Sequence, residues 1–279
     1  MFSQRTGARR ARSSLGAVTG YVHGYGTPEQ QRLIEQADHW RHRLICDGTR
    51  LEEGSRLLEV GCGVGAVLAV LGQEYPGVRL FGVDIEPKQL EFARAHLARA
   101  GVEATVAEGD ALALPFEDES FDHVWMMWFL EHLADPPEAL REARRVLVPG
   151  GAITAIEVDY GTCHARPSTP ALKGLFDAMV RGMAASGWSD AGTRLPGWLR
   201  EAGFRDVDEG ERPVWWQGDE LPGQANYAAD VLESALDALV QLPGTRDDEL
   251  QAGLADLRGL PRQAEAGLGW VIHKSTATR

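Results

Sequence analysis

A glycine-rich loop is the strongest chemical signal in the sequence. The apolar run Leu57–Val60 leads into Gly61, Gly63 and Gly65 at alternate positions, and an apolar helical pattern follows them. Glycine permits a tight turn and lets a ligand approach the backbone closely. Because three glycines at this spacing are weak evidence alone, a plain strand-to-helix turn is the alternative.

An acid that follows the loop strengthens the case for a nucleotide-type ligand. Asp84 closes the next apolar run, where a carboxylate can accept hydrogen bonds from both hydroxyls of an adenosine ribose. The same carboxylate can cap the helix that begins at Pro87, and the two roles are compatible. Ala66 satisfies the looser dinucleotide pattern, so the loop by itself also admits a nicotinamide or flavin enzyme.

Two later acids are candidates for work on a substrate. Glu157 and Asp159 lie two residues apart on an extended segment, so their side chains point the same way. Such a pair could bind an amine or act as a base, and solvated loop acids are the alternative. Tyr160 and His164 follow on the same segment and are expected to contact substrate.

Alternating strands and helices must position these groups. Apolar patterns predict strands at 56–60, 79–83, 104–107, 121–127 and 152–158. Helical patterns are expected at 29–46, 66–74, 87–100 and 136–147, the last ended by a Pro149-Gly150-Gly151 turn. This alternation predicts an α/β fold with a parallel sheet, in which ligands bind beyond the carboxyl ends of the strands.

The pattern changes after residue 160. Helices are expected at 169–186, 194–202, 225–242 and 247–258, with strand-like stretches at 204–216 and 270–274. Because no clean linker appears, we expect one domain at 28–279, preceded by a flexible arm or lid at 1–27. A cofactor half at 28–160 would carry substrate-pocket insertions at 161–203 and 217–267. The part of the chain after residue 160 holds tryptophans that either line an acceptor pocket or fill the core: Trp188, Trp198, Trp215, Trp216 and Trp270.

Five further motifs follow the loop in a fixed order. They are Glu108–Ala111, Leu114–Phe116, Ser120–Asp122, Trp128–Leu133 and Arg145–Gly151. The set resembles the class I S-adenosylmethionine (SAM)-dependent methyltransferases of the ubiquinone/menaquinone-type, small-molecule branch, over about residues 55–160. The resemblance implies a Rossmann-like, doubly wound, seven-stranded and mostly parallel sheet, with inserted helices forming a lid.

The resemblance also implies roles for individual residues at a SAM site. Asp84 would bind the ribose, Asp110 the adenine amino group, and Arg32 the SAM carboxylate. Met-Met-Trp at 126–128 is bulkier than is usual there, and His132 is a structural residue in relatives rather than a base. The remaining expected cofactor contacts are Tyr25, Glu59, Gly61, Cys62, Gly63, Ile85, Gln89, Ala111, Met126 and Met127.

A tyrosine- and glycine-rich segment before the first helix is similar to the arm that closes over such sites. His23 and Tyr25 join Glu157 and Asp159 as candidate catalytic residues, and Tyr21 joins Trp128 as a candidate substrate contact. An ordinary loop with its tyrosines packed on the body is the alternative.

Methyl transfer from SAM is a direct displacement that needs no protein nucleophile or metal. We therefore expect a methyltransferase that uses SAM, releases S-adenosylhomocysteine (SAH), and acts on a small, aromatic or polycyclic molecule. Whether oxygen, nitrogen or carbon is methylated stays open. A nicotinamide-dependent oxidoreductase and a non-catalytic SAM-binding protein are the alternatives.

Composition narrows the choice of partners. The 279 residues carry 28 basic and 41 acidic side chains, a formal charge of −13, which argues against nucleic-acid and anionic membrane partners. No apolar run is long enough to span a bilayer. Three scattered cysteines show no metal-site spacing, so we expect no metal and a cytoplasmic protein, either monomer or homodimer.

Overall fold

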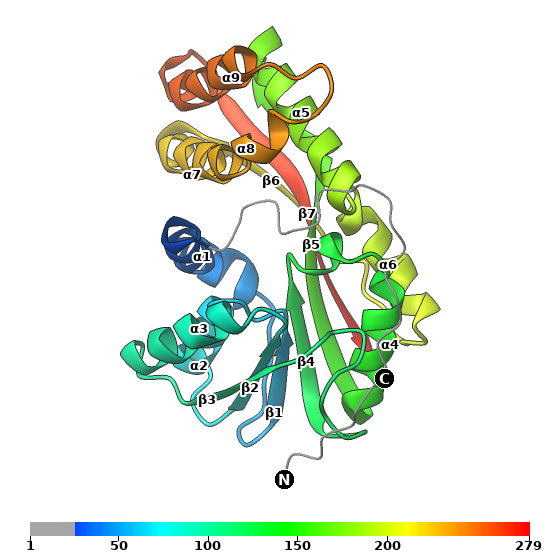
Figure 1. Cartoon of the computed structure of the whole chain (residues 1–279). Helices are drawn as coiled ribbons and strands as arrows, with labels where there is room; N and C mark the ends of the chain where they lie inside the picture. Colours follow the sequence, from blue (N-terminus) through cyan, green and yellow to red (C-terminus); the bar gives the residue numbers. More distant parts are fainter. Residues whose placement is uncertain (1–25) are drawn as a thin grey trace.

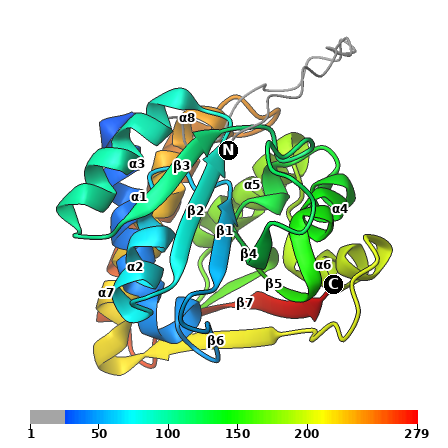
Figure 2. The same ribbon diagram turned by 90° about the horizontal axis from the view of Figure 1, so that it is seen from below.

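A seven-stranded sheet organises the chain, in the order β3-β2-β1-β4-β5-β7-β6 (Figures 1 and 2). The computed structural model describes residues 26–279, so Tyr21, His23, Tyr25 and nearly all of the expected arm lie outside the described residues. Strands β1 to β5 run parallel, and β7 runs antiparallel to both β5 and β6. The predicted mostly parallel sheet is thereby confirmed. The strands are β1 (Arg56–Val60), β2 (Arg79–Asp84), β3 (Ala104–Glu108), β4 (Phe121–Met127), β5 (Leu147–Arg166), β6 (Glu211–Gln217) and β7 (Gly267–Thr278).

Helices cover both faces of the sheet (Figure 2). Helices α1, α2 and α3 lie on one face, and α4 and α6 pack on the other. Helices α5, α7, α8 and α9 gather beyond the carboxyl ends of the parallel strands (Figure 1). The helices are α1 (Thr27–Trp40), α2 (Ala66–Glu74), α3 (Pro87–Arg99), α4 (Pro136–Val146), α5 (Pro170–Ser186), α6 (Ala191–Glu201), α7 (Leu221–Ser234), α8 (Leu236–Leu239) and α9 (Asp247–Gly259). Within the described part of the chain, no helix combines the length and apolarity needed to cross a bilayer.

Several elements differ from the sequence-based expectation. The expected helix at 225–242 is divided into α7 and α8, and the strand expected within 204–216 is β6 alone. The first helix does not run to residue 46 as one α-helix, because a π-helix (Arg41–Ile45) follows Trp40. The Cys46 N–H donates to the Arg41 carbonyl, the i→i+5 bond of that form. Strand β5 begins at Leu147 and absorbs the expected 149–151 turn. Leu147 pairs with Phe121 of β4 ahead of a register shift, and the antiparallel pairing with β7 begins at Ala152, so the partners of β5 come from strands that local turn signals cannot foresee.

An aromatic cluster joins α1 to β6, β7 and α7. Trp40 is 1% exposed, and its ring lies 5.8 Å from Trp216, 6.1 Å from Trp128 and 6.4 Å from Trp270, between centroids. The Trp40 indole N–H donates to the Tyr227 hydroxyl of α7 at 3.0 Å. Helix α1 is therefore held against β6, β7 and α7 by aromatic packing.

A buried lysine ties β7 to the chain after the π-helix. Lys274 is 2% exposed, and its Nζ donates to the carbonyl oxygens of Leu44 and Asp47 and to the Thr49 hydroxyl. Burial lowers the pKa of Lys274 to about 8, with Arg212 adding to the effect. The cation satisfies carbonyl groups that would otherwise have lost water without replacement.

Candidate functional site

A cavity of about 730 Å³ opens at the carboxyl ends of the parallel strands. Its walls come from the loop after β1, the ends of β2, β4 and β5, helices α1, α5 and α7, and strand β7. The glycine loop and the end of β2, where the site is expected, both line this cavity. The volume lies within the range of small-molecule sites.

The glycine loop forms the floor of this cavity because side chains would not fit there. Gly61 has φ +75°, and an added Cβ would lie 2.2 Å from the ring of Phe129. Gly63 has φ +47°, and an added Cβ would meet nothing within 4 Å. The backbone at Gly63 therefore faces open space, which lets a ligand approach the chain directly.

Asp84 is held at the rim of the cavity by two backbone donors. Its Oδ2 accepts from Gly63 N–H at 2.8 Å, and its Oδ1 accepts from Glu86 N–H at 2.9 Å. Burial raises the pKa of Asp84 despite these bonds. Each carboxylate oxygen can accept a further bond, so local capping leaves capacity for a ligand's hydroxyl groups.

Glu59 provides a second acid below the loop. It is 4% exposed and lines the cavity, and its Oε2 has no hydrogen-bond partner. Burial raises the pKa of Glu59 well above its ordinary value, with Asp84 adding to the effect. An orphan buried oxygen beside an open cavity suits a ligand that brings donors or positive charge.

Three other expected cofactor contacts frame the opening. Ile85 is 62% exposed and offers an apolar side chain at the rim. Gln89 is buried and accepts from the Gln30 amide at 3.1 Å. Arg32 lines the cavity from α1 and forms a two-bond ion pair with Glu29. Cys62 and Met127 also line the cavity, and both are buried.

Asp110 and Ala111 lie outside the cavity lining but at the same sheet edge. Gly109 N–H donates to the Asp84 carbonyl at 3.0 Å, which places the end of β3 beside the end of β2. Asp110 is exposed, and one of its oxygens accepts from Leu112 N–H. Their expected adenine contacts remain predictions.

The expected roles of Glu157 and Asp159 need correction. The two side chains do share one face of β5, but neither lines the cavity, which is walled by their neighbours Val158 and Tyr160. Asp159 accepts from the Thr193 hydroxyl of α6 at 2.6 Å. Glu157 is fully buried, and its Oε1 accepts from the N–H groups of Phe129 and Leu130.

The side chains of two further expected site residues lie away from the cavity, and the cofactor contact expected of the Met126 backbone stays a prediction. The Met126 side chain packs in the core on the α4 and α6 face, because side chains alternate along β4. His164 stacks on the exposed ring of Trp215, 5.0 Å between centroids, outside the cavity. Tyr160 and Trp128, by contrast, do line the cavity.

The aromatic wall comes mostly from residues that sequence reasoning did not single out. Trp40, Tyr227 and Phe176 line the cavity from three helices that are distant in sequence, and Trp270 lines it from β7. Trp188 and Trp198 instead pack against each other on the α6 face, 5.4 Å between centroids. The remaining two of the five tryptophans are Trp216, which is buried in the core, and Trp215, which is 39% exposed.

Polar groups gather at one point of this wall. Glu131 is 2% exposed, and its Oε1 accepts from the Tyr160 hydroxyl at 3.0 Å and lies 3.4 Å from His132 Nε2. Burial lowers the pKa of His132 to about 4, so the ring is neutral at pH 7. Glu131 was missed, although it follows the end of β4, where an acid at a strand's carboxyl end is the relevant signal.

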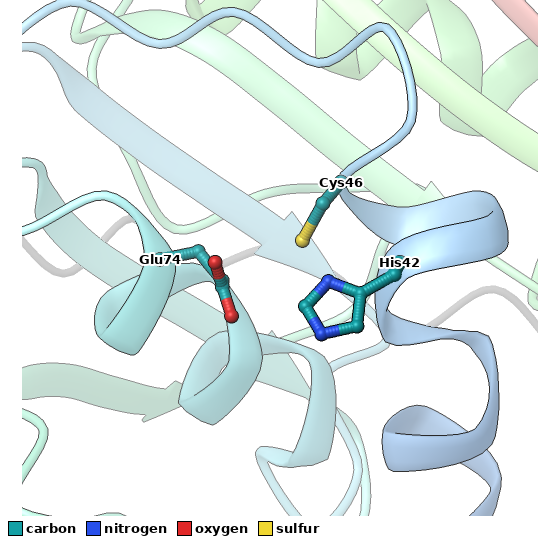
Figure 3. Close-up of side chains that lie close together, drawn as sticks. All are labelled: His42, Cys46 and Glu74. Atoms are coloured by element: carbon teal, nitrogen blue, oxygen red, sulfur yellow. The ribbon is translucent and has the colours of Figure 1, made fainter.

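One group of possible metal ligands occurs among residues 26–279, away from the cavity. His42, Cys46 and Glu74 point toward one another from the π-helix and the end of α2, with ligand atoms within 4.8 Å (Figure 3). The Arg41 guanidinium donates to Glu74 at 3.1 Å and so places positive charge on this group.

Comparisons with known proteins decide the family. Residues 58–155 match a family model described as a methyltransferase domain. The chain is 32% identical over 224 residues to the 27-O-demethylrifamycin SV methyltransferase of Amycolatopsis mediterranei, covering 76% of this chain and 79% of that protein. The chain belongs to the class I SAM-dependent methyltransferases.

Other relatives agree over shorter spans or at the level of the fold. This methyltransferase is 36% identical over 118 residues to the demethylmenaquinone methyltransferase of Thermus thermophilus, which is 42% of this chain and only about half, 53%, of that protein. It has the fold of the SAM-bound phosphoethanolamine N-methyltransferase 2 of Haemonchus contortus. That likeness has a TM-score of 0.54 and 19% identity, over 86% of this chain and 52% of the other.

The residues present fit the SAM that this family uses. The open backbone at Gly63, the acceptor capacity of Asp84 and the unpartnered oxygen of Glu59 meet in one cavity. This methyltransferase therefore offers acceptors and negative charge where a positively charged ligand with ribose hydroxyls is to be held.

Proposed function

We propose that this methyltransferase transfers the methyl group of SAM to a small, largely apolar molecule with aromatic rings. The observation that carries the proposal is the continuity of the cavity. One space runs from Gly63 and Asp84 to the aromatic wall of Trp40, Trp128 and Tyr227. Such a wall suits a flat, apolar acceptor better than a polypeptide or nucleic acid.

SAM supplies a methyl group that is already activated by a positively charged sulfur. The protein's part is to bind, orient and exclude water. The glycine loop and Asp84 hold the donor end, and Trp128 and Tyr227 orient the acceptor. Tyr21, His23, Tyr25, Arg32, Asp110 and Ala111 are proposed to complete the two ends of the site.

The relatives' names support a small-molecule acceptor. A demethylrifamycin and a demethylmenaquinone are named as the substrates of the two proteins compared above, and both proteins are methyltransferases.

We propose that residues 28–160 form the cofactor half, that inserted segments on α5 and α7 form the acceptor end, and that 1–27 act as a lid. Three free cysteines support a reducing, cytoplasmic location. A monomer or homodimer is proposed, and size-exclusion chromatography with light scattering distinguishes the two.

Two measurements test the proposed function. Calorimetry should detect SAM and SAH binding and no binding of NAD, and tight NAD binding without SAM binding would overturn the proposal. A screen with isotopically labelled SAM against phenols, amines and indoles should then transfer label to an aromatic compound. Labelling of added protein or nucleic acid instead would contradict the acceptor class.

A further inference from the structure

Two buried carboxyl groups meet behind the aromatic wall. Glu131 and Glu157, here called the carboxyl pair, lie close enough for each to affect the ionisation of the other, and they are 2% and 0% exposed. Each has an Oε2 that finds no donor on a neighbouring residue. One proton held between the two carboxyl groups would satisfy both oxygens.

The surroundings of the pair contain little that stabilises two negative charges. Glu157 Oε1 accepts from Phe129 N–H at 3.1 Å and Leu130 N–H at 2.7 Å. Tyr160 of β5, His132 after β4 and Tyr227 of α7 are the titratable groups that face Glu131. Among residues 26–279, no lysine or arginine forms an ion pair with either acid. The nearest effect of a cation is that of Arg32 of α1, whose charge favours the ionised form of Tyr227 and so tends to lower the pKa of Tyr227.

Such a pair takes up at most one negative charge near neutral pH. Burial raises the pKa of Glu157 to about 7 and that of Glu131 well above its ordinary value, and their mutual repulsion raises the latter further. Two adjacent buried carboxyls cannot both ionise without a compensating cation, so the pair titrates as a unit.

The pair reaches the cavity through Glu131. Glu131, His132 and Tyr160 line it beside Trp128 and Tyr227, within walls that are mostly apolar. A hydroxyl on an aromatic acceptor would find few other hydrogen-bond partners there. Glu157 is covered by the 129–130 backbone and acts only through Glu131.

We propose that the carboxyl pair takes the proton of the acceptor, which makes the methylated group an acidic hydroxyl such as a phenol or enol. This inference rests on the proposed methyl transfer. The acceptor's O–H bond breaks and its proton passes to Glu131, while the proton already held by the pair is taken by Glu157. The acceptor oxygen forms a bond to the methyl carbon as the bond from that carbon to sulfur breaks, leaving SAH.

Charge balance favours this assignment. Before transfer, the sulfonium carries +1 and the singly protonated pair carries −1. Afterwards SAH is neutral at sulfur and the doubly protonated pair is also neutral. Removing opposite charges together avoids leaving an isolated charge in an apolar cavity. Glu131 is accordingly a catalytic residue, and Glu157 is a positioning residue that sets its proton affinity.

Proton linkage to binding tests the pair without any acceptor. Calorimetry of SAM and of SAH, each in phosphate and in Tris from pH 6 to 8, gives the protons released on binding. SAM should release a fraction of a proton that SAH does not, because its positive charge favours the ionised pair. Glu131→Gln should reduce the difference to what Glu59, the other buried acid of the cavity, contributes, and the exposed Glu103→Gln should retain it in full.

Two further variants keep the test informative should Glu131→Gln not fold. Glu157→Gln still offers an oxygen to Phe129 and Leu130, and it should move the linkage to lower pH because one acid is removed. Tyr160→Phe removes a donor to Glu131 and should move the linkage to higher pH. SAM binding with no such linkage, or linkage that is undiminished in Glu131→Gln, overturns the inference alone. Absence of SAM binding overturns the proposed function first.

Activity provides the second arm. With an acceptor from the labelled-SAM screen, the product should carry a new O-methyl group, and methylation at nitrogen or carbon would overturn the assignment. Glu131→Gln should lower kcat about 10²- to 10⁴-fold, a far larger factor than its effect on the Kd for SAM. The loss should shrink for acceptors with more acidic hydroxyls, which a merely structural role for Glu131 would not produce.

Discussion

At the scale of single residues, the cavity places backbone where most proteins would place side chains. The absence of a side chain at Gly61 leaves room for the Phe129 ring. The absence of one at Gly63, in the same loop, leaves the backbone open to a ligand. Asp84 bridges the loop and the next helix while keeping acceptor capacity. The binding of SAM and the stability of the loop can therefore be separated by mutation.

Replacing Asp84 with alanine tests its contact with the ribose. At about 1.5–3 kcal/mol for each hydrogen bond to a charged group, losing one or two such bonds should cost about 2–4 kcal/mol of SAM affinity. Calorimetry measures the loss, with Glu103→Ala as an exposed acidic control outside the cavity. SAM affinity within twofold of the unmodified protein would show that the ribose is bound elsewhere.

Alanine at Gly61 should mainly affect the stability of the fold, and alanine at Gly63 should mainly affect SAM binding. Gly61→Ala should lower the free energy of unfolding by about 1–3 kcal/mol, because its Cβ would overlap the Phe129 ring. Gly63→Ala meets open space and should cost only about 1 kcal/mol of backbone strain, yet weaken SAM binding more strongly than it weakens the fold. Urea unfolding and calorimetry on both variants give the comparison. Equal losses of stability would contradict it.

At the scale of elements, helix α1 connects the two ends of the site. It supplies Arg32 near the cofactor end and Trp40 near the aromatic wall, and the π-helix after it is held by Lys274 of β7. Periodicity alone predicts a helix at this place. It does not predict the π-helix, because the carbonyl groups that Lys274 satisfies are paired by a strand more than two hundred residues later.

Truncating Trp40 tests this connection. Trp40→Ala removes a fully buried indole and its bond to Tyr227, so we expect a loss of about 3–5 kcal/mol in the free energy of unfolding. Trp40→Phe should recover part of the loss, since it keeps a ring among Trp128, Trp216 and Trp270. Chemical denaturation measures both variants. A loss below about 1 kcal/mol in the alanine variant would mean that α1 is held by other contacts.

At the scale of the whole molecule, much of the fold but little of the acceptor end is predictable from sequence. Strands β1 to β4 follow local apolar patterns, and the first three of these patterns end in glycine or acid. Alternation along β5 correctly puts Glu157 and Asp159 on one face. It cannot tell which face meets the cavity, because that depends on where α6 packs. Trp40, Phe176 and Tyr227 come together only through tertiary packing, so no local sequence pattern predicts the aromatic wall.

Burial of histidine makes the stability of the whole molecule depend on pH. His123 contacts the Thr154 hydroxyl at 2.9 Å, and burial lowers its pKa to about 4. Between pH 6.5 and 4 the unfolded chain binds more protons, so the free energy of unfolding falls as pH falls. The contribution of His123 is complete above pH 6.5.

The variant His123→Gln should flatten this dependence. At 1.36 kcal/mol per pKa unit, the stability difference between the two proteins should change by roughly 3 kcal/mol from pH 7 to pH 4. Urea unfolding across this range measures the difference in the free energy of unfolding between the two proteins. The carboxyl pair, whose raised pKa values change stability in the opposite direction, contributes to both proteins alike and cancels in this difference. A constant difference would show that the pKa of His123 is the same in the folded and the unfolded protein.

The place of β7 has a consequence for how the protein is made. This strand lies between β5 and β6, yet it follows both in the chain, and β6 has β7 as its sheet neighbour. A growing chain that has not yet left the ribosome beyond residue 267 can assemble β1 to β5, but β6 must wait. During synthesis, therefore, the cofactor end of the site can form before the acceptor end, whose Leu268 and Trp270 arrive late.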